Sequence, residues 1–464
     1  MALLLENPDA NSMAEEPATE PATLPPAETP REVSWQAFLV PALIATAIIV
    51  LLFATSPNFR WTEGPDASPY AGDFLQEWVG GRVVREGDHS RFYDPRYARE
   101  LEHDPAIVPQ TWKRDEYLPL VYPPFYYVLV APLSYLSLTS AAWVWAALTT
   151  SWLCGALAIL VTSSGTLRPP LGETRWPDDT ATFTAWLPWL LPAAVLFAPV
   201  LESLASSQKG TLCLLVMTAT LALLRHQRPL EAGMAFGLLV FKPQLGIVVG
   251  VAMLFRGEWK FAVGSAITVA AAAGISLALG FDVCRQYLDF LRHGANYMST
   301  PGYDLAKAHT WLGFFALLTG EPTGLATRVL SIGALLGTMG LLAWMFRETP
   351  RLDSPQFARQ FAALVVATIL VSPHFFTYDL TILLLPLTVV GMQLATTKPE
   401  DRPAWTWLLP LLYVAPALSV SLASSFGLQI SVPLMAALLA CLALETPSIE
   451  LPNGEIARGK PAAL

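Results

Sequence analysis

The chain has 464 residues, of which 53% are apolar and only 14% charged, whereas soluble domains carry roughly 25% charged residues. Its mean hydropathy is +0.45, and apolar runs of 14–25 residues recur along it. This composition excludes a series of ordinary soluble domains and indicates a polytopic membrane protein. The net charge of −9 and the lack of a basic block argue against nucleic-acid binding. The 4 cysteines show neither zinc-binding nor disulfide spacing.

Residues 1–34 form the first segment, which we expect to be a disordered cytoplasmic tail. The segment holds 6 prolines and 7 acidic residues but no aromatic residue, so it cannot bury enough apolar surface to fold. Residues 35–55 follow as the first membrane-spanning helix, close to the roughly 20 residues that a bilayer requires. We expect residues 35–445 to form one transmembrane domain and residues 446–464 to form a second cytoplasmic tail.

A long polar loop, residues 56–120, follows the first span. Its 65 residues carry 12 acidic and 8 basic side chains, a concentration of charge found nowhere else in the chain. Residues 73–85 and 95–102 mix apolar and charged positions at a spacing typical of amphipathic helices. We expect two short helices there, lying at the membrane interface.

Two apolar segments are irregular. Residues 122–135 are too few to cross a bilayer comfortably and contain Pro123-Pro124, so they predict a re-entrant or interfacial helix. Residues 231–255 are interrupted at their middle by Lys242-Pro243. Proline removes a backbone hydrogen bond, and a lysine near the bilayer centre is costly unless it faces protein or water. This segment therefore predicts two half-helices that meet at Lys242.

The remaining apolar runs predict full spans at residues 139–162, 182–199, 209–224, 261–280, 324–346, 358–371, 375–395, 405–423 and 428–444. With the first span, the expected fold is an all-α bundle of about ten transmembrane helices plus three short segments. The loops rich in Lys and Arg then share one side, which the positive-inside rule makes cytoplasmic. Both termini fall on that side, and the 56–120 loop becomes the first extracytoplasmic loop.

Five local sequences occur in an order that is recognisable as a set. They are Asp73-Phe74 through Trp78 to Phe92-Tyr93-Asp94, then Tyr122-Pro123-Pro124-Phe125, Ser207-Gln208-Lys209-Gly210, Lys242-Pro243-Gln244-Leu245, and Ser372-Pro373-His374 with Tyr378-Asp379-Leu380. Together they resemble glycosyltransferase family 87, the polyprenol-phosphate-sugar-dependent enzymes of the GT-C superfamily. Ser207 departs from the glycine commonly found before that glutamine. The resemblance implies a GT-C-like transmembrane bundle and sugar transfer from a lipid-phosphate donor.

Asp73 is the candidate catalytic base, because the resemblance implies an acidic residue near the start of the first outer loop. Such a carboxylate can accept the proton of an acceptor hydroxyl. The alternative is a helix cap, a role that aspartate often has. Glu77 lies four residues later, on the same helix face, and is the second candidate.

Lys242 is the candidate cation for the donor phosphate, since a fixed positive charge in a dry site stabilises a phosphate leaving group. Alternatively, it is a lysine whose ammonium snorkels to the interface. Lys209 either assists it or marks the outer end of a span. The resemblance places further substrate-binding candidates at Gln208, Tyr122, His374, Tyr378 and Asp379, whereas Lys307 and His309 belong to its weakest part.

The working hypothesis is a glycosyltransferase of the bacterial inner membrane that acts on the extracytoplasmic face. The donor would be a polyprenyl-phosphate sugar (mannose-like, or another hexose or pentose), and the acceptor an envelope glycan or glycolipid. No Asp-x-Asp motif occurs in the predicted outer loops, so we expect neither a metal nor another cofactor. The alternative from another class is a polytopic transporter or flippase, because such proteins also place broken helices at the midplane.

Overall fold

The computed structural model of the chain describes residues 39–444, with gaps at 65, 88, 114–115, 165–186, 294–302, 396 and 398, and two short strands beyond them. The strands β1 (Ile449–Glu450) and β2 (Ile456–Ala457) pair antiparallel, and the rest of the described part consists of helices and connecting loops. The predicted all-α fold is confirmed. The predicted tail 1–34 lies outside the described residues, as does the tail 446–464 apart from the strands.

Nine of the ten predicted spans are present as helices. They are α1 (Leu39–Thr55), α5 (Leu138–Ser164), α9 (Gly210–Arg225), α12 (Trp259–Leu279), α15 (Leu325–Met345), α16 (Pro355–Val371), 3₁₀ helix η10 (Thr377–Leu383) with α17 (Leu384–Ala395), η12 (Ala404–Trp407) with α18 (Leu408–Phe426), and α19 (Ser431–Leu444). Within the described residues, five helices are long and apolar enough to cross a membrane: Leu138–Leu160, Trp259–Leu279, Leu325–Met345, Thr377–Ala395 and Ala404–Phe426. The chain is an integral membrane protein, and the count of ten spans stays a prediction.

The tenth predicted span, residues 182–199, is described only from residue 187 and differs from the expectation. A 3₁₀ turn, η5 (Leu187–Trp189), leads into α7 (Leu190–Leu196), and a separate helix, α8 (Ala198–Ala205), follows. The break lies at Phe197, which is extended because Pro199 occupies the first turn of α8. The prediction of one continuous helix up to residue 199 is therefore wrong.

The outer loop contains the two predicted helices, α2 (Phe74–Glu86) and α3 (Pro95–Glu102), after a short turn, η2 (Pro57–Phe59). The residues of α2 from Phe74 to Gly81 are all buried, so α2 packs within the protein rather than exposing a polar face, and its position at the membrane interface stays a prediction. Gly80 packs against the Tyr127 ring and Gly81 against the Ala131 backbone, where a Cβ atom would lie 2.3 and 3.0 Å away. Because these two glycines have no side chains, α2 packs directly against the segment that contains Tyr127 and Ala131.

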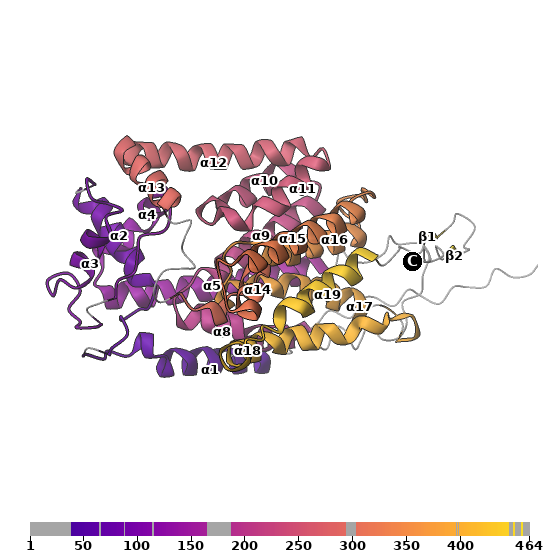
Figure 1. Cartoon of the computed structure of the whole chain (residues 1–464), viewed down its shortest axis with the longest axis horizontal. Coiled ribbons are helices and arrows are strands. Elements are labelled where there is room, and N and C mark those ends of the chain that lie inside the picture. The colour runs from indigo at the N-terminus through magenta and orange to yellow at the C-terminus, as the bar shows by residue number, and fades with distance from the viewer. Residues whose placement is uncertain are drawn as a thin grey trace, which may run out of the picture.

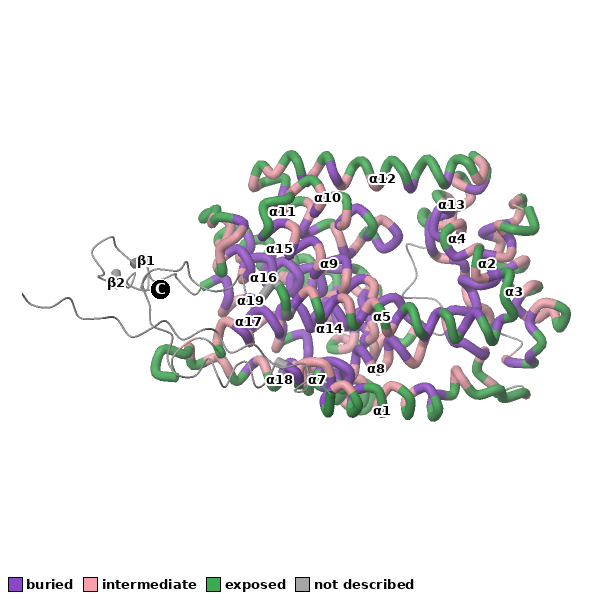
Figure 2. The backbone as a smooth tube through the Cα atoms, turned by 180° about the vertical axis from the view of Figure 1, so that it is seen from behind, coloured by how far each residue is buried: buried purple, intermediate pink, exposed green. Residues whose placement is uncertain are grey.

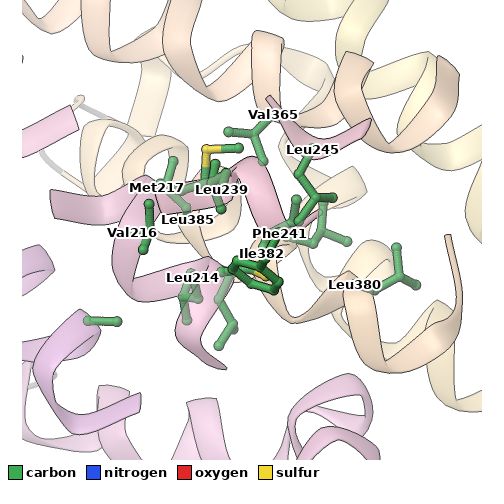
Figure 3. Packing of buried hydrophobic residues seen from close by; sticks show 14 of the residues in the cluster. Leu214, Val216, Met217, Leu239, Phe241, Leu245, Val365, Leu380, Ile382 and Leu385 are labelled. Carbon is green, nitrogen blue, oxygen red and sulfur yellow. The ribbon is translucent and has the colours of Figure 1, made fainter. Parts of the chain in front are cut away.

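The Tyr122 segment is short, as predicted: α4 (Pro124–Val130) continues into η3 (Ala131–Tyr135). The Lys242 segment is broken, as predicted, into α10 (Pro229–Gly237), η6 (Leu238–Phe241), η7 (Pro243–Leu245) and α11 (Ile247–Phe255). Lys242 itself has φ −131° and ψ 71°, so its backbone belongs to neither half. Figure 3 shows the tips of both halves packing on α9, α16 and η10 through Phe241, Leu245, Leu214, Val365 and Ile382.

The helices of the outer loop gather at one end of the molecule with α4 and with α13 (Phe281–His293), a helix that was not predicted (Figure 1). The second unpredicted helix is α14 (Trp311–Thr319), and two short turns, η9 (Leu305–Lys307) and η11 (Pro399–Asp401), complete the described helices. Figure 2 shows that α12 is mostly exposed along one edge, whereas α16 is almost wholly buried at the centre. An apolar helix that is exposed along its length is expected to face lipid.

The contact between α10 and α12 is unusually close because it is made by glycines. A Cβ atom on Gly233 would lie 2.0 Å from the carbonyl oxygen of Phe261, and one on Gly264 would lie 2.0 Å from that of Leu230. These distances leave no room for a methyl group. The two helices therefore form one unit that carries the Lys242 break.

Replacing Gly233 by alanine should destabilise the protein by about 1–3 kcal/mol, because the added methyl group forces α10 away from α12. Gly274→Ala, on α12, is the matched control, since nothing lies within 4 Å of its added Cβ atom. Alanine there should be neutral or stabilising by up to about 1 kcal/mol. Thermal unfolding in detergent, followed by tryptophan fluorescence, measures both variants. Equal melting temperatures for the two would contradict the close contact.

Candidate active site

Asp73 lies at the start of α2, on a backbone that is strained. Ala71 and Gly72 immediately before it have φ values of 68° and 55°, in the left-handed region that costs a non-glycine residue roughly 1–2 kcal/mol. The carboxylate caps no backbone N–H of α2 and instead accepts a hydrogen bond from the side-chain amide of Gln208. The helix-cap interpretation is therefore wrong.

The Asp73 side chain is only half-buried, so a substrate can reach it. Burial raises the pKa of the Asp73 carboxyl, and the positive charge of Lys209 and the hydrogen bond from Gln208 oppose this rise. Partial desolvation raises the basicity of a carboxylate, and neighbours that favour its charged form oppose protonation; both properties suit a general base.

Glu77, the second base candidate, lies in a different environment from Asp73. Its side chain is completely buried, as is that of Lys209, and the two form an ion pair. The second carboxylate oxygen of Glu77 accepts a hydrogen bond from the Tyr126 hydroxyl at 2.5 Å. The Lys209 ammonium also lies 4.3 Å from the centroid of the buried Tyr122 ring. The charges of Glu77 and Lys209 thus neutralise each other in the interior of the protein.

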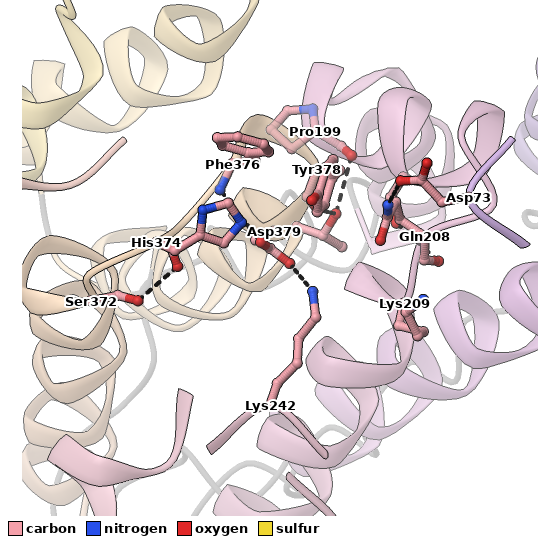
Figure 4. Close-up of polar contacts among 12 residues, drawn as sticks. Asp73, Pro199, Gln208, Lys209, Lys242, Ser372, His374, Phe376, Tyr378 and Asp379 are labelled. Carbon is pink, nitrogen blue, oxygen red and sulfur yellow. Dashed lines mark hydrogen bonds and ion pairs between the residues drawn. The ribbon is translucent and has the colours of Figure 1, made fainter. Parts of the chain in front are cut away.

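Lys242 has a counter-charge within the protein. Its ammonium lies 2.6 Å from Oδ1 of Asp379, and the two side chains are 9% and 4% exposed (Figure 4). Lys242 also lies 5.4 Å from the centroid of the Tyr378 ring. It does not snorkel to an interface, so that interpretation is wrong. The expectation that this lysine faces protein or water is met by Asp379.

His374 lies in the loop between α16 and η10, beside Asp379 (Figure 4). Its Nδ1 is 3.2 Å from the Tyr303 hydroxyl, and its ring contacts Phe376 with centroids 4.3 Å apart. Burial lowers the pKa of His374 to about 4, and the nearby Asp379 only partly opposes this. His374 is therefore neutral at pH 7 and can bind an anion only by donating a hydrogen bond, not by its charge.

The Asp73 and Lys242 clusters belong to one site. Gly210, the first residue of α9, packs so closely on η10 that an added Cβ atom would lie 2.4 Å from the Tyr378 carbonyl oxygen. From the other side, Tyr126 of α4 stacks on Phe241, directly before Lys242, with centroids 5.7 Å apart. The structure thus brings together all nine predicted site residues, which come from five separate segments.

Of the two weakest candidates, Lys307 reaches the rim of the site and His309 does not. Lys307 forms an ion pair with Glu202 at 3.5 Å. His309 is buried, with Nδ1 2.6 Å from Ser431 Oγ and Nε2 3.1 Å from Thr377 Oγ1, so it holds the loop before α14 in place. Sequence reasoning missed Tyr126 and Tyr303, because no spacing distinguishes either tyrosine from its aromatic neighbours. No group of three or more His, Cys, Asp or Glu side chains suited to a metal occurs among the described residues.

Glu102, at the end of α3, is a buried carboxyl that pairs with no cation among the described residues. Its Oε2 accepts a hydrogen bond from the Leu118 N–H at 2.8 Å, and its Oε1 has no partner among the described residues. Burial raises the pKa of Glu102 to about 8, well above the ordinary value near 4.5. A raised pKa means that folding favours the protonated carboxyl, so stability is full below pH 4.5 and falls as the pH rises toward 8.

Glu102→Gln should therefore stabilise the protein near neutral pH, by about 3 kcal/mol at pH 7, and have almost no effect at pH 4. The amide keeps an acceptor for the Leu118 N–H and carries no charge to desolvate. Melting temperatures of both proteins across pH 4–8 measure the difference. A constant difference over that range would contradict a titrating Glu102. Glu116→Gln, at an exposed carboxylate of the same loop, is the control.

Comparison with known proteins assigns the family. The sequence profile of Glycosyltransferase family 87 matches residues 120–373, more than half of the chain, and this range includes Gln208 and Lys242 but not Asp73. The crystal structure of ArnT from Cupriavidus metallidurans in the apo state is similar over 87% of this chain and 76% of that chain, with 13% identity. Its TM-score of 0.36 is too low to establish a shared fold. No curated protein matches. The extent of the profile match confirms the predicted family: the chain belongs to glycosyltransferase family 87.

Proposed function

We propose that this glycosyltransferase moves a sugar from a polyprenyl-phosphate donor to a glycan or glycolipid acceptor. The observation that carries the proposal is the half-buried Asp73 carboxylate, held by Gln208, in one site with the buried Lys242 ammonium. A carboxylate base and a fixed cation are the two groups that this transfer needs, because the lipid phosphate is already a good leaving group.

In the proposed step, the acceptor hydroxyl oxygen attacks the anomeric carbon of the donor sugar from the face opposite the phosphate. The new C–O bond forms as the bond between that carbon and the phosphate oxygen breaks, with inversion of configuration. The hydroxyl proton moves to Asp73, and the electron pair of the broken bond leaves with polyprenyl phosphate. Lys242 stabilises the charge on that phosphate.

The neighbouring side chains have supporting roles in this proposal. An ammonium has three N–H donors, and Asp379 accepts one of those of Lys242, so the ammonium can also donate to a phosphate oxygen. His374 and Tyr378 lie beside the pair and are placed to orient the donor. Lys209 and Tyr122 line the wall between the two clusters. Glu77 balances Lys209, and the Lys209 charge in turn favours ionised Asp73.

The direct test uses purified protein with radiolabelled polyprenyl-phosphate mannose, arabinose or glucose and an envelope extract as acceptor. We expect label to move from one of these donors into a glycan or glycolipid, with Asp73→Asn as the inactive control. The break at Lys242 is also a feature of transporters, so the same lipids are placed in proteoliposomes. Movement of an intact lipid-linked sugar across the bilayer without transfer would overturn the proposal in favour of a flippase.

We further propose that the protein lies in a bacterial inner membrane with the site on the extracytoplasmic face. Exposed positions test this better than buried ones such as Gln208. Single cysteines replacing Arg60, Pro373 and Ser425, in a cysteine-free background, should react with an impermeant maleimide in intact cells, and one replacing His226 should not; all four positions are exposed. Labelling of position 226 with protection of position 373 would invert the orientation.

A further inference from the structure

Both partners of the Asp73–Gln208 hydrogen bond follow a left-handed residue that is not glycine. Ala71 lies two residues before Asp73 with φ 68°, and Ser207 lies directly before Gln208 with φ 56°. Ser207 is buried, and its hydroxyl has no partner among the described residues, so its side chain does not hold this conformation. A strained conformation of this kind persists only when neighbouring groups hold it in place.

One residue, Asn58, holds both strained segments, through its side chain on one side and its backbone on the other. Asn58 donates from Nδ2 to the carbonyl oxygen of Ala205 at 2.9 Å, three residues before Gln208. The backbone carbonyl oxygen of Asn58 accepts the N–H of Ala71 at 2.7 Å. Asn58 therefore joins the end of α8 to the turn before α2 through one residue.

Gly72 shows how tightly the three segments meet at this point. A Cβ atom on Gly72 would lie 3.2 Å from Cγ and Nδ2 of Asn58 and 3.3 Å from the carbonyl oxygen of Ser206. The Asn58 amide thus fills the junction between the segment that carries Asp73 and the segment that carries Gln208. Ser56 supports it, since its hydroxyl accepts the Asn58 N–H and donates to Ala205, both at 3.3 Å.

We infer that Asn58 is a positioning residue for sugar transfer: it fixes the two backbone segments so that Gln208 holds the Asp73 carboxylate in place. This inference rests on the proposed function and adds a residue to it that touches neither substrate nor the carboxylate. Without the Asn58 side-chain amide, the bond to Ala205 is lost while the backbone bond to Ala71 remains, so the segment that carries Ser207 and Gln208 shifts relative to Asp73 and the hydrogen bond between Gln208 and Asp73 is weakened.

Loss of the Asn58 side-chain amide should change the pH dependence of kcat/KM. The Gln208 hydrogen bond favours the ionised form of Asp73, so its loss raises the pKa of that carboxyl, and the acid limb of the kcat/KM profile moves to higher pH. The other charged or titratable groups that act on or respond to Asp73 are unchanged by the substitution: Lys209, Lys242, Lys307, Glu77, Glu102 and Tyr122.

The test compares Asn58→Asp and Asn58→Leu with the natural protein. Neither substituted side chain can donate to Ala205. Asn58→Asp keeps the shape of the amide but adds a negative charge that itself raises the pKa of Asp73, so the acid limb is read in Asn58→Leu. We expect kcat to fall roughly 10–100-fold, the fold-change for losing one hydrogen bond to a charged group, with an unchanged KM for the donor and a shifted acid limb. Adding Ser207→Gly should partly restore kcat, because glycine adopts φ 56° without strain.

Gln286→Ala is the matched control. Like Asn58, Gln286 is an amide that joins distant backbone segments, by accepting from the Tyr93 N–H and donating to the His89 carbonyl oxygen. Its loss should lower the melting temperature and leave the acid limb in place. An Asn58→Leu acid limb like that of the natural protein would overturn the inference, as would the same shift in Gln286→Ala.

A second measurement does not depend on transfer. Infrared titration of the carboxyl band, with Asp73→Asn as the blank, should give a higher pKa for Asp73 in Asn58→Leu than in the natural protein. An inactive natural protein with this shift would overturn the proposed function and leave the positioning role intact. An active natural protein without the shift would overturn the positioning role alone.

Discussion

Replacing Asp73 by asparagine should reduce the rate of sugar transfer roughly 10²–10⁴-fold, the usual contribution of a general base, and leave donor affinity nearly unchanged. The amide keeps the shape of the carboxylate but cannot accept the acceptor's proton. Donor affinity should survive because Lys242, the proposed phosphate ligand, pairs with Asp379 and makes no contact with Asp73. Single-turnover kinetics with labelled donor separates the chemical step from binding.

Asp94→Asn is the control for this experiment. Asp94 belongs to the same outer loop, and its carboxylate accepts the Arg96 N–H at 2.9 Å as the cap of α3, a role that asparagine performs equally well. Its transfer rate should stay near that of the natural protein. Glu77→Gln is a poorer control, because it leaves the buried Lys209 without its counter-charge. Transfer by Asp73→Asn at the natural rate would remove Asp73 from the mechanism.

Lys242→Met should have two separate effects. Removing one partner of a buried ion pair leaves Asp379 uncompensated, which costs roughly 3–5 kcal/mol of stability. The same substitution removes the proposed phosphate ligand and should weaken donor binding. The single variant cannot distinguish these effects, because a destabilised protein also binds poorly.

The double variant Lys242→Met with Asp379→Asn separates the two effects. It contains no unpaired charge at this point, so most of the lost stability should return, whereas donor affinity should stay low. Lys242→Arg keeps the charge with a different reach and should recover part of the affinity. Equilibrium binding of the polyprenyl-phosphate sugar, with the melting temperature of each variant, measures both quantities. A double variant that binds donor as tightly as the natural protein would show that Lys242 serves only Asp379.

Much of this fold could be predicted from residues that determine the structure of their own segment. The Lys242-Pro243 pair marks a break in an apolar run because proline and a buried charge act on their own helix, whatever else the chain contains. The burial of α2 was not predictable in the same way. It depends on Gly80 and Gly81 meeting the surface of α4 and η3, and the spacing of apolar residues gives no information about such a partner.

In the candidate site, too, the residue types could be predicted from the sequence, whereas contacts between residues far apart in the sequence could not. The motif order predicted the residue types, but the pairing within the site depends on contacts across 137 residues for Lys242 and Asp379 and 132 for Lys209 and Glu77. Sequence reasoning therefore assigned Lys242 to a ligand and left Lys209 either to assist it or to mark the outer end of a span. The structure shows that each already has a carboxylate of the protein as its partner, which changes the expected result of every charge-removing substitution.

The distance in sequence between Lys242 and Asp379 also bears on how the chain is made. The ribosome adds roughly 5–20 residues per second, so the 137 residues between the two positions take roughly 7–30 seconds to synthesise. During that interval Lys242 has left the ribosome and its carboxylate partner does not yet exist. A lysine placed at the bilayer centre in that state costs roughly 2.5–3.5 kcal/mol. The half-helices that meet at Lys242 therefore gain their charge partner only after η10 has been synthesised, and any nascent chain that ends before Asp379 lacks this counter-charge.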